Sequence, residues 1–508
     1  MKCRNWIVIF IAMSSCVTGL CRAAESVRPQ KPNLLFVLTD QWRRQAMGFM
    51  NDDPVLTPNL DRFSEKAAVF DRAVATVPVC TPNRAVLITG NYPLRNGVLA
   101  NDMRIDENSQ SLGVILKNAG YSTGYIGKWH IDGKREFTPP GKRRQGFDFW
   151  HKAVFHVPFN QPYYIQDDPK EVRVQGWAPI YATDTAIEYM KENEDKPFSL
   201  VVSYGPPHRG GGKGMEDAPG INDQLTGYGY KAPAEFEELY STEPFKALGR
   251  RPNVRPVSGK FDSTPVVPGY FGAITALDHE FGRLMDYLEE SGLDKNTIVI
   301  FTSDHGEMMG SQGLMMKCSW YDESAGVPCL IKAPGVNPRR VQAPFGAVDV
   351  MPTLLGLMGV EKPPMDGVDF SPLLMEKKMD VPEFTFLSFY KGGAKEIYRQ
   401  WRAVYSDRYT YVAVGDWAGW KSTKIPQNGG VALYDHKNDP YEMNPIYRGQ
   451  GMDELMERMH HELENFLKEQ NDPFLEKVWV GRKDKNGAPD TARYDELVKK
   501  YYKTDPAE

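Results

Sequence analysis

Four apolar segments of this sequence each run directly into polar residues that could do chemistry. They are NLLFVLTDQ, STGYIGKWH, FSLVVSYGPPH and TIVIFTSDH, which end in Asp40 and Gln41, in Lys128 and His130, in His208, and in Asp304 and His305. Carboxylate, amide and imidazole groups bind divalent cations such as Ca²⁺ or Mg²⁺. A single Asp or His after a strand is usually a helix cap or an ordinary loop residue, but four such ends indicate a site. A metal ion among lysines and histidines favours an anionic substrate of the sulfate or phosphate type.

The apolar part of each segment is a predicted strand buried on both faces, because apolar and polar residues do not alternate in it. These strands cover 33–38, 122–126, 198–203 and 297–302, and helical patterns occur at 60–68, 111–119, 183–191 and 270–291. Strands that alternate with helices predict an α/β fold, a large and mostly parallel sheet sandwiched by helices. The carboxyl ends of parallel strands meet at one edge, so we expect the polar residues to converge there.

The stretch VPVCTPNRAVLITG places Cys80 just before Pro82 at the start of another predicted helix, with Arg84 one turn further on. Proline is preorganised for the first helical turn. Cys80 therefore lies at the positively polarised end of the helix, where an oxyanion would bind. Alone, this cysteine would be read as a packing residue. Beside four polar strand ends, it becomes a candidate for chemistry.

The cysteine count also singles out Cys80. Of six cysteines, three stand within the first 21 residues, which leaves Cys80, Cys318 and Cys329. An odd number in an oxidising compartment indicates a free or chemically special thiol. Cys318 and Cys329 either pair with each other or stay reduced.

Here the sequence resembles the type I sulfatases, the formylglycine-dependent family of the alkaline phosphatase superfamily. CTPNRAVLITG matches the family signature, CxPxR followed by a small residue and TG. Further family motifs follow in order: PNLLFVLTD, GYSTGYIGKWH, SDHGEMMGSQGLMMK, VDVMPTLLGLMG and LYDHKNDPYEMNP. CxPxR alone is weak evidence, but the ordered set covers about residues 32 to 445 and is highly specific.

The resemblance implies that a formylglycine-generating maturation enzyme converts Cys80 to formylglycine. The hydrated aldehyde carries two hydroxyl groups on one carbon. One attacks sulfur in line and expels the alcohol, and the second then collapses to the carbonyl and ejects sulfate. A serine would remain sulfated because it lacks the second hydroxyl.

The resemblance also implies a metal site of Asp40, Gln41, Asp304 and His305, with one divalent ion per chain. Ca²⁺ is the preferred ion and Mg²⁺ the alternative. Many family members have an aspartate in place of Gln41 and an asparagine in place of His305. Two carboxylates predict weaker metal affinity than three, together with less repulsion of the incoming sulfate.

Five further residues receive roles from the same resemblance. Arg84 and Lys128 would support the diol and the developing charge, and His130 would take the diol proton. His208 and Lys317 would bind sulfate and assist the leaving oxygen. Lys317 has the least support, because MMKCSW is also typical of a solvated surface lysine.

The first 24 residues are predicted to be a secretory signal peptide. Lys2 and Arg4 precede a short apolar stretch, and small residues follow near Ala23. That stretch is shorter than the about 20 apolar residues of a membrane span, and no transmembrane segment is expected elsewhere. We expect a secreted or periplasmic protein. A lipoprotein acylated at Cys16 or Cys21 is the less favoured alternative.

The mature chain is predicted to have two parts. Residues 25–380 would form the α/β catalytic domain. Residues 381–508 carry alternating, aromatic-rich segments and then a helical pattern at 452–469, which predict an α+β subdomain with an antiparallel sheet.

An exported sulfatase would meet sulfated carbohydrate, so a sulfated polysaccharide or its oligosaccharides is the expected substrate. Trp401, Tyr405, Trp417 and Trp420 could stack on sugar rings, although a place in the core of the subdomain is slightly favoured. The irregular insertion at 205–268 includes five cations: Arg209, Lys213, Arg250, Arg251 and Arg255. They either pair with further anionic groups of a glycan or, as is more usual, form a solvated face.

Charge excludes one class of partner and leaves two other functions open. The net charge is -5 without a basic block, so nucleic acid is not expected as a partner. One alternative within the superfamily is hydrolysis of phosphonate monoesters or phosphodiesters. An alternative of another class is a non-catalytic glycan-binding protein in which Cys80 stays unmodified.

Overall fold

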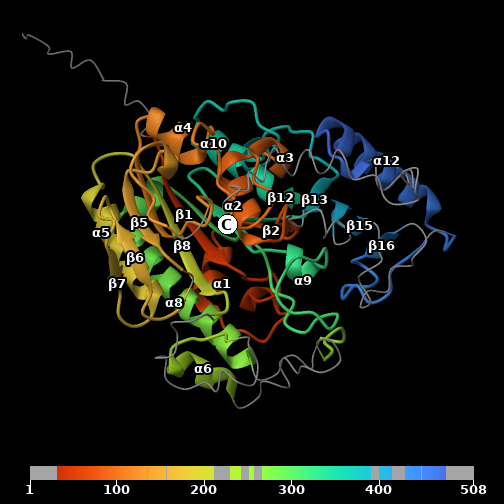
Figure 1. Cartoon of the computed structure of the whole chain (residues 1–508), viewed down its shortest axis with the longest axis horizontal. Coiled ribbons are helices and arrows are strands. Elements are labelled where there is room, and N and C mark those ends of the chain that lie inside the picture. The colour runs from red at the N-terminus through yellow and green to blue at the C-terminus, as the bar shows by residue number, and fades with distance from the viewer. Residues whose placement is uncertain are drawn as a thin grey trace, which may run out of the picture. The chain divides into compact units, whose positions relative to one another are not determined.

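The computed structural model describes residues 31–133, 136–155, 157–210, 229–241, 251–256, 266–390, 400–414, 430–447 and 449–475 (Figure 1). Its strands are β1 (Asn33–Asp40), β2 (Ala68–Phe70), β3 (Ala73–Val74), β4 (Ser122–Lys128), β5 (Phe149–Ala153), β6 (Pro162–Ile165), β7 (Glu171–Arg173), β8 (Phe198–Pro207), β9 (Thr297–Ser303), β10 (Cys329–Lys332), β11 (Arg339–Val341), β12 (Phe345–Gly346), β13 (Thr385–Phe389), β14 (Trp401–Tyr405), β15 (Tyr409–Val414) and β16 (Val431–Asp435). Its α-helices are α1 (Pro58–Ser64), α2 (Cys80–Thr89), α3 (Pro93–Asn96), α4 (Leu112–Asn118), α5 (Ala178–Glu192), α6 (Ala234–Ser241), α8 (Val267–Ser291), α9 (Asp322–Ala325), α10 (Ala347–Leu357), α11 (Ser371–Leu374) and α12 (Asp453–Glu469), and short 3₁₀ helices are η1 (Gly48–Met50), η2 (Lys142–Arg144) and η4 (Leu293–Asn296). Among the described residues, no helix is long and apolar enough to cross a membrane.

The larger sheet contains all four predicted strands as neighbours. Its order is β11-β2-β10-β9-β1-β8-β4-β5-β6-β7. β1 is parallel to β9 and β8, and β8 is parallel to β4, so Leu35 lies opposite Leu200 on one side and Val299 on the other. The prediction of a mostly parallel central sheet is confirmed.

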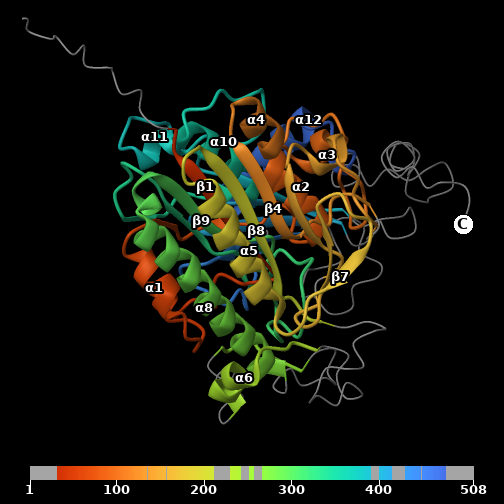
Figure 2. The same ribbon diagram turned by 90° about the vertical axis from the view of Figure 1, so that its left-hand side faces the viewer.

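Side chains of β1 alternate between two hydrophobic cores, one on each face of the sheet. Phe36 packs in a core that includes residues of α2, α4 and α10, whereas Leu35 packs in a core with α1, α5 and α8. Figure 2 shows α1, α5 and α8 on one face and α2, α4 and α10 on the other. A strand covered on both faces has no polar side, which explains the uninterrupted apolar runs in the sequence.

The helices predicted around these strands are found with shifted ends. The pattern at 183–191 belongs to α5, which begins earlier at Ala178 because Pro179 fits the first helical turn. The pattern at 270–291 is α8. Helix starts could not be predicted as well as helix positions, because apolar spacing marks the buried face of a helix and not its ends.

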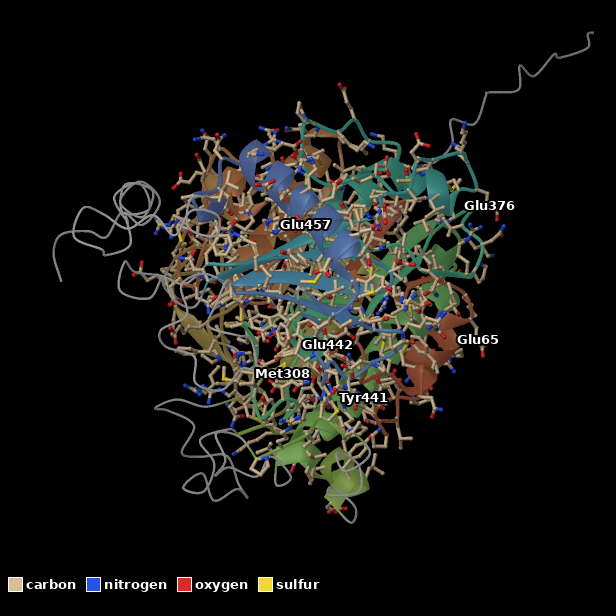
Figure 3. The ribbon with its side chains drawn as sticks, turned by 90° about the vertical axis from the view of Figure 1, so that its right-hand side faces the viewer. Glu65, Met308, Glu376, Tyr441, Glu442 and Glu457 are labelled. Atoms are coloured by element: carbon tan, nitrogen blue, oxygen red, sulfur yellow. The ribbon has the colours of Figure 1, made fainter. Side chains whose placement is uncertain are left out.

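The C-terminal segments form a four-stranded antiparallel sheet of order β13-β14-β15-β16 with α12 packed against it (Figure 3). Phe466 of α12 stacks on Phe386 at 4.1 Å and also contacts Tyr92, which follows α2 in the chain. The predicted antiparallel sheet with a packed helix is therefore present. The predicted boundaries at 24/25 and 380/381 stay predictions, and residues 1–24 lie outside the described ranges.

Candidate active site

The carboxyl ends of β9, β1, β8 and β4 lie at one edge of the sheet, because these neighbouring strands are parallel. Asp40 and Lys128 are the last residues of β1 and β4, and Asp304 and His208 directly follow β9 and β8. All four side chains are buried. The structure therefore brings together the strand ends that the sequence predicted to converge, while their catalytic roles stay predictions.

Cys80 is the first residue of α2 and lies among these strand ends. Its Sγ is 3.2 Å from His305 Nε2, 3.4 Å from Lys317 Nζ and 3.8 Å from Asp40 Oδ1. In Figure 1, α2 lies against the sheet beside β1. The packing of this helix on the sheet thus carries Cys80 into the middle of the polar cluster.

Two cations hold the two carboxylates of the cluster. Arg84 donates from Nε to Asp304 Oδ2 at 2.7 Å, and Lys128 Nζ donates to Asp40 Oδ2. Burial and the charge of Cys80 would raise the pKa of Asp40, but the charges of Lys128 and Arg84 hold it far below its usual value. Burial and the charge of Asp40 instead raise the pKa of Asp304. Asp40 is thus the firmly ionised member of the pair.

A glycine allows the end of β4 to reach this position. Gly127 has a φ of +103°, and a Cβ built on it would lie 1.9 Å from Ser203 O of β8. The next residue, Lys128, accepts hydrogen bonds at its carbonyl oxygen from Arg84 Nη1 and Ser203 Oγ, both at 2.8 Å. Close approach of the two strands therefore requires glycine in the GKWH motif.

The surroundings of residue 80 favour a negative charge on its side chain. Burial would raise the pKa of the Cys80 thiol, but Lys128, Lys317 and His305 lower it well below its ordinary value. Neighbouring positive charge favours the thiolate. The same charges would favour the deprotonated form of an oxygen nucleophile at this position.

Lys317 belongs to the site and is not a solvated surface residue. Its Nζ donates to His208 Nε2 at 2.9 Å and to Gln41 Oε1 at 3.0 Å. His208 Nδ1 donates to Arg209 O at 2.7 Å, so Nε2 is the unprotonated acceptor. Burial and the charge of Lys317 lower the pKa of His208 to about 4. Burial would also lower the pKa of Lys317, but the charges of Cys80 and Asp40 raise it, so Lys317 is the protonated member of the pair.

His130 lies at the edge of the cluster, with 11% of its side chain exposed. Its backbone has a φ of 59°, and its Nε2 lies 3.3 Å from Asp102 Oδ1. The residue before Asp102, Asn101, accepts the Thr81 N–H at 3.0 Å. The segment at Asn101 and Asp102 therefore links the start of α2 to His130.

The donor atoms fit a divalent cation. Asp40, Cys80, Asp304 and His305 each offer one ligand atom, and these atoms lie within 4.8 Å of one another. His305 Nδ1 donates to Gly306 O at 2.9 Å, which leaves Nε2 able to act as a ligand. Its Nε2 lies 3.5 Å from an oxygen of Asp40 and from one of Asp304. Two carboxylates, an imidazole and the nearby Gln41 amide oxygen suit a hard ion that accepts oxygen ligands.

Sequence reasoning missed two buried groups beside the site, Glu307 and Tyr230. Glu307 follows the polar strand end directly in SDHGE, and this position was a signal that could have been used. Tyr230 stands in the glycine-rich insertion, where no periodicity indicated a buried residue. Both side chains contact Gln41.

Trp401 and Tyr405 lie in the core, the place slightly favoured from the sequence, and the alternative of stacking on sugar rings is wrong. Each of these side chains is 1% exposed, because β14 lies inside the C-terminal sheet and both rings pack in its core. Trp401 Nε1 donates to Cys318 O at 3.1 Å. Trp417 and Trp420 lie outside the described residues.

Arg251, expected on a solvated face or at a glycan, is instead 4% exposed. Its guanidinium bonds Glu323 Oε1 at 2.7 Å and Asp52 Oδ1 at 2.6 Å, so it anchors its segment to the body of the protein. Arg209 and Arg255 are described and stay candidates, whereas Lys213 and Arg250 lie outside the described residues.

The structure answers the question about the other two cysteines. Cys318 and Cys329 are both reduced thiols, and no disulfide joins them. Burial raises the pKa of Cys329, so this thiol is not activated. Cys80 differs from Cys329 in the direction of its pKa shift, because charged groups surround Cys80.

Parallel strand ends that gather candidate metal ligands and cations around Cys80 are suited to the hydrolysis of an anionic ester. The comparisons agree: the family model described as Sulfatase matches residues 32–360, and the model described as N-sulphoglucosamine sulphohydrolase, C-terminal, matches residues 310–469. The chain belongs to the sulfatase family and is a sulfuric ester hydrolase.

Two named sulfatases are similar to this protein over most of its length. An ulvan-active sulfatase of Formosa agariphila is 33% identical over 94% of this chain and 89% of its own length. An endo-4-O-sulfatase of Bacteroides thetaiotaomicron is 30% identical over 91% of this chain and 97% of its own. A solved structure from work on glycosaminoglycan metabolism by the same bacterium has a TM-score of 0.76 and 28% identity, and covers 89% of this chain and 100% of that chain.

Acidification is expected to destabilise the fold between about pH 6.5 and 4. Burial lowers the pKa of His208 and His151 to about 4 and that of His436 to about 3. The unfolded chain therefore takes up these protons first as the pH falls, and stability is lost by about 1.4 kcal/mol per pH unit for each histidine. Urea unfolding at a series of pH values measures the slope. His436→Gln should make it shallower, and an unchanged slope would contradict the assignment.

Proposed function

We propose that the protein is an exported sulfatase that removes sulfate from a sulfated polysaccharide or its oligosaccharides, with a formylglycine nucleophile made from Cys80. The position of Cys80 Sγ, in contact with His305 and Lys317 and near Asp40, carries the proposal. Relatives whose names refer to ulvan and to endo-4-O-sulfatase activity support a glycan substrate. The predicted signal peptide is consistent with a substrate in the extracellular or periplasmic space.

Asp40, Gln41, Asp304 and His305 would hold one divalent ion, with Ca²⁺ preferred over Mg²⁺. When bound, the ion would supply positive charge to a sulfate oxygen and to the nucleophile. Arg84 fixes the position of Asp304, and Lys128 keeps Asp40 ionised.

The hydrated aldehyde at position 80 would supply the attacking hydroxyl and the second hydroxyl that releases sulfate. Lys317 is a protonated group in contact with this position, and His208 Nε2 accepts its hydrogen bond. Lys317 can therefore donate a proton to the departing alcohol oxygen, while its charge stabilises the sulfate. His130, at the edge of the cluster around residue 80, would accept the diol proton.

Two measurements on protein from a host with the maturation enzyme test the proposal. Mass spectrometry of the peptide that contains residue 80 should find formylglycine, and inorganic sulfate should be released from sulfated oligosaccharides of defined position and length. Matched aryl sulfate and phosphonate esters distinguish the sulfatase from its phosphonate-cleaving relatives. Glycan binding without sulfate release by matured protein would overturn the proposal in favour of a binding protein.

A group of cations beside His130 supports an anionic glycan as the substrate. Arg104 Nε lies 3.2 Å from Asp132 Oδ1, and Arg143 Nη2 lies 2.7 Å from Asp132 Oδ2. Lys152 is buried next to them, and burial together with the charge of Arg143 lowers its pKa to about 8. Arg104 and Arg143 share the Asp132 carboxylate, whereas Lys152 Nζ donates to Thr138 Oγ1 at 2.9 Å. Arg104 is exposed close to Asp102, the partner of His130.

Arg104→Ala is expected to lower kcat/KM on a sulfated oligosaccharide by about 10-fold, because a hydrogen bond between charged groups is lost. Turnover of a small aryl sulfate should stay unchanged. Arg458→Ala on α12 is the matched control, since its side chain is 51% exposed compared with 47% for Arg104. Equal loss on both substrates would rule out a role in glycan recognition.

A further inference from the structure

Glu307 is a fully buried carboxylate that the mechanism above does not use. We propose that Glu307 is a positioning residue, which turns the Gln41 amide oxygen toward the metal site and holds the loop that carries Lys317. The inference depends on the metal site of the proposed function and not on the conversion of Cys80.

One carboxylate oxygen of Glu307 sets the orientation of Gln41. Glu307 Oε2 accepts hydrogen bonds from Gln41 Nε2 and, at 2.7 Å, from the Tyr230 hydroxyl. Gln41 Nε2 also donates to the Tyr230 hydroxyl at 3.0 Å. A carboxylate can only accept, so the amide nitrogen must face Glu307 and the amide oxygen must face the site. That oxygen accepts from Lys317 Nζ at 3.0 Å.

The backbone of Gln41 is fixed as well, which leaves the amide little freedom. Gln41 has a φ of 71°. Its N–H donates to Asp304 Oδ1 at 3.1 Å, and its carbonyl oxygen accepts from the Tyr270 hydroxyl at 2.9 Å. Burial and the charge of Glu307 raise the pKa of Tyr230, so this hydroxyl stays protonated and keeps its hydrogen bond.

The other oxygen of Glu307 holds the Lys317 loop. Glu307 Oε1 accepts the Met309 N–H at 2.9 Å and the Met316 N–H at 2.6 Å. Met309 and Met316 have φ values of 44° and 69°, in the left-handed region that non-glycine residues rarely adopt. Met316 directly precedes Lys317 in the chain. Hydrogen bonds from Gln41 to Glu307, from Lys317 to Gln41 and from Met316 to Glu307 therefore form a closed ring, which the backbone between Met316 and Lys317 completes.

Glu307→Gln tests this ring, because an amide cannot accept on both sides. If the new amide oxygen faces the Met309 and Met316 N–H groups, the new amide nitrogen faces Gln41 Nε2. Two donors would then meet, so the Gln41 amide must turn over. If the new amide oxygen faces Gln41, the loop loses both acceptors. We expect Ca²⁺ affinity, measured by calorimetric titration of the unmodified protein, to fall about 10- to 100-fold, the range typical of lost outer contacts of a metal ligand.

The double variant Gln41→Glu/Glu307→Gln again pairs one hydrogen-bond donor with one acceptor between positions 41 and 307. The new amide at position 307 can then donate to the new carboxylate at position 41, while the amide oxygen holds the loop. The second oxygen of the carboxylate at position 41 faces the site. We expect the double variant to bind Ca²⁺ at least about ten times more tightly than Glu307→Gln alone. Gln41→Glu alone should bind weakly, since it places two carboxylates in contact.

Glu323→Gln is the matched control, because Glu323 is 1% exposed and bonds Arg251 and Asn253 instead of site residues. It should lower the melting temperature and leave Ca²⁺ affinity unchanged. Wild-type affinity in Glu307→Gln, or a double variant no better than Glu307→Gln, overturns the proposal. Should Glu307→Gln not fold, Tyr230→Phe decides in the same titration: a fall in affinity of a few-fold supports the proposal, and no change overturns it. No outcome depends on turnover, so a failure of the formylglycine proposal would be seen separately.

Discussion

Cys80→Ser is expected to lower sustained turnover of a sulfate ester by at least about 10³-fold, the scale seen when a nucleophile is removed. The serine hydroxyl would occupy the place of Cys80 Sγ, 3.4 Å from Lys317 Nζ and 3.2 Å from His305 Nε2. It can attack sulfur, but it has no second hydroxyl to release the product. We therefore expect a single turnover and a sulfated serine, which mass spectrometry of the peptide identifies.

Cys329→Ala is the control for this variant. Cys329 is also buried, at 2% exposure, but it lies in β10 among apolar side chains. Its loss should affect stability and leave the rate per folded molecule unchanged. Repeated turnover by Cys80→Ser would show that residue 80 is not the nucleophile.

Asp40→Asn is expected to abolish stabilisation by Ca²⁺ and to lower turnover on the order of 10³-fold, because a metal ion supplies several kcal/mol to the transition state. The substitution removes the charge that faces Lys128 in a buried position. An unpaired buried ammonium group costs about 3–5 kcal/mol. The melting temperature should fall without added metal, and it should no longer rise when Ca²⁺ is added.

The control is Asp349→Asn at the start of α10. Asp349 is buried and accepts the Gly346 and Val368 N–H groups at 2.8 Å, and burial raises its pKa to about 7. This variant should be less stable but should keep the full response to Ca²⁺. An equal response to Ca²⁺ in Asp40→Asn and wild type would exclude Asp40 as a ligand.

The strands and their polar ends could be predicted because their signals are local. β1, β4, β8 and β9 are short apolar runs buried on both faces, and a parallel sheet must bring their carboxyl ends to one edge. Cys80 was singled out by the helix start around Pro82 and by the odd cysteine count. These inferences need only the order of elements along the chain, and the structure agrees with them.

The contacts of the loops could not be predicted, because they join residues far apart in the sequence. Glu307 bonds Tyr230 and Gln41 across elements whose packing the sequence does not reveal. The sequence motifs indicated two carboxylates, Asp40 and Asp304, at the proposed metal site. Glu307 is a third carboxylate, and it accepts a hydrogen bond from Gln41 on the side away from that site. The prediction of weaker metal affinity than in three-carboxylate sites did not include the charge of Glu307.

Exposure of aromatic and charged side chains was the least predictable property. Alternation in WRAVY marks two faces of a strand, but it does not say that both faces of β14 are covered. Trp401 and Tyr405 are therefore core residues. Arg251 was likewise unpredictable, since its partners Asp52 and Glu323 lie 199 and 72 residues away in the chain.

The burial of Cys80 fixes the order of events in the life of the protein. At 2% exposure, with α2 packed on the sheet and charged side chains around it, its thiol cannot enter the active site of another enzyme in the folded state. The proposed oxidation must therefore take place on the nascent or unfolded chain, while CTPNR is still an extended peptide. If residue 80 is modified as proposed, a molecule that folds first would stay inactive, and the yield of working enzyme would depend on the relative rates of modification and folding.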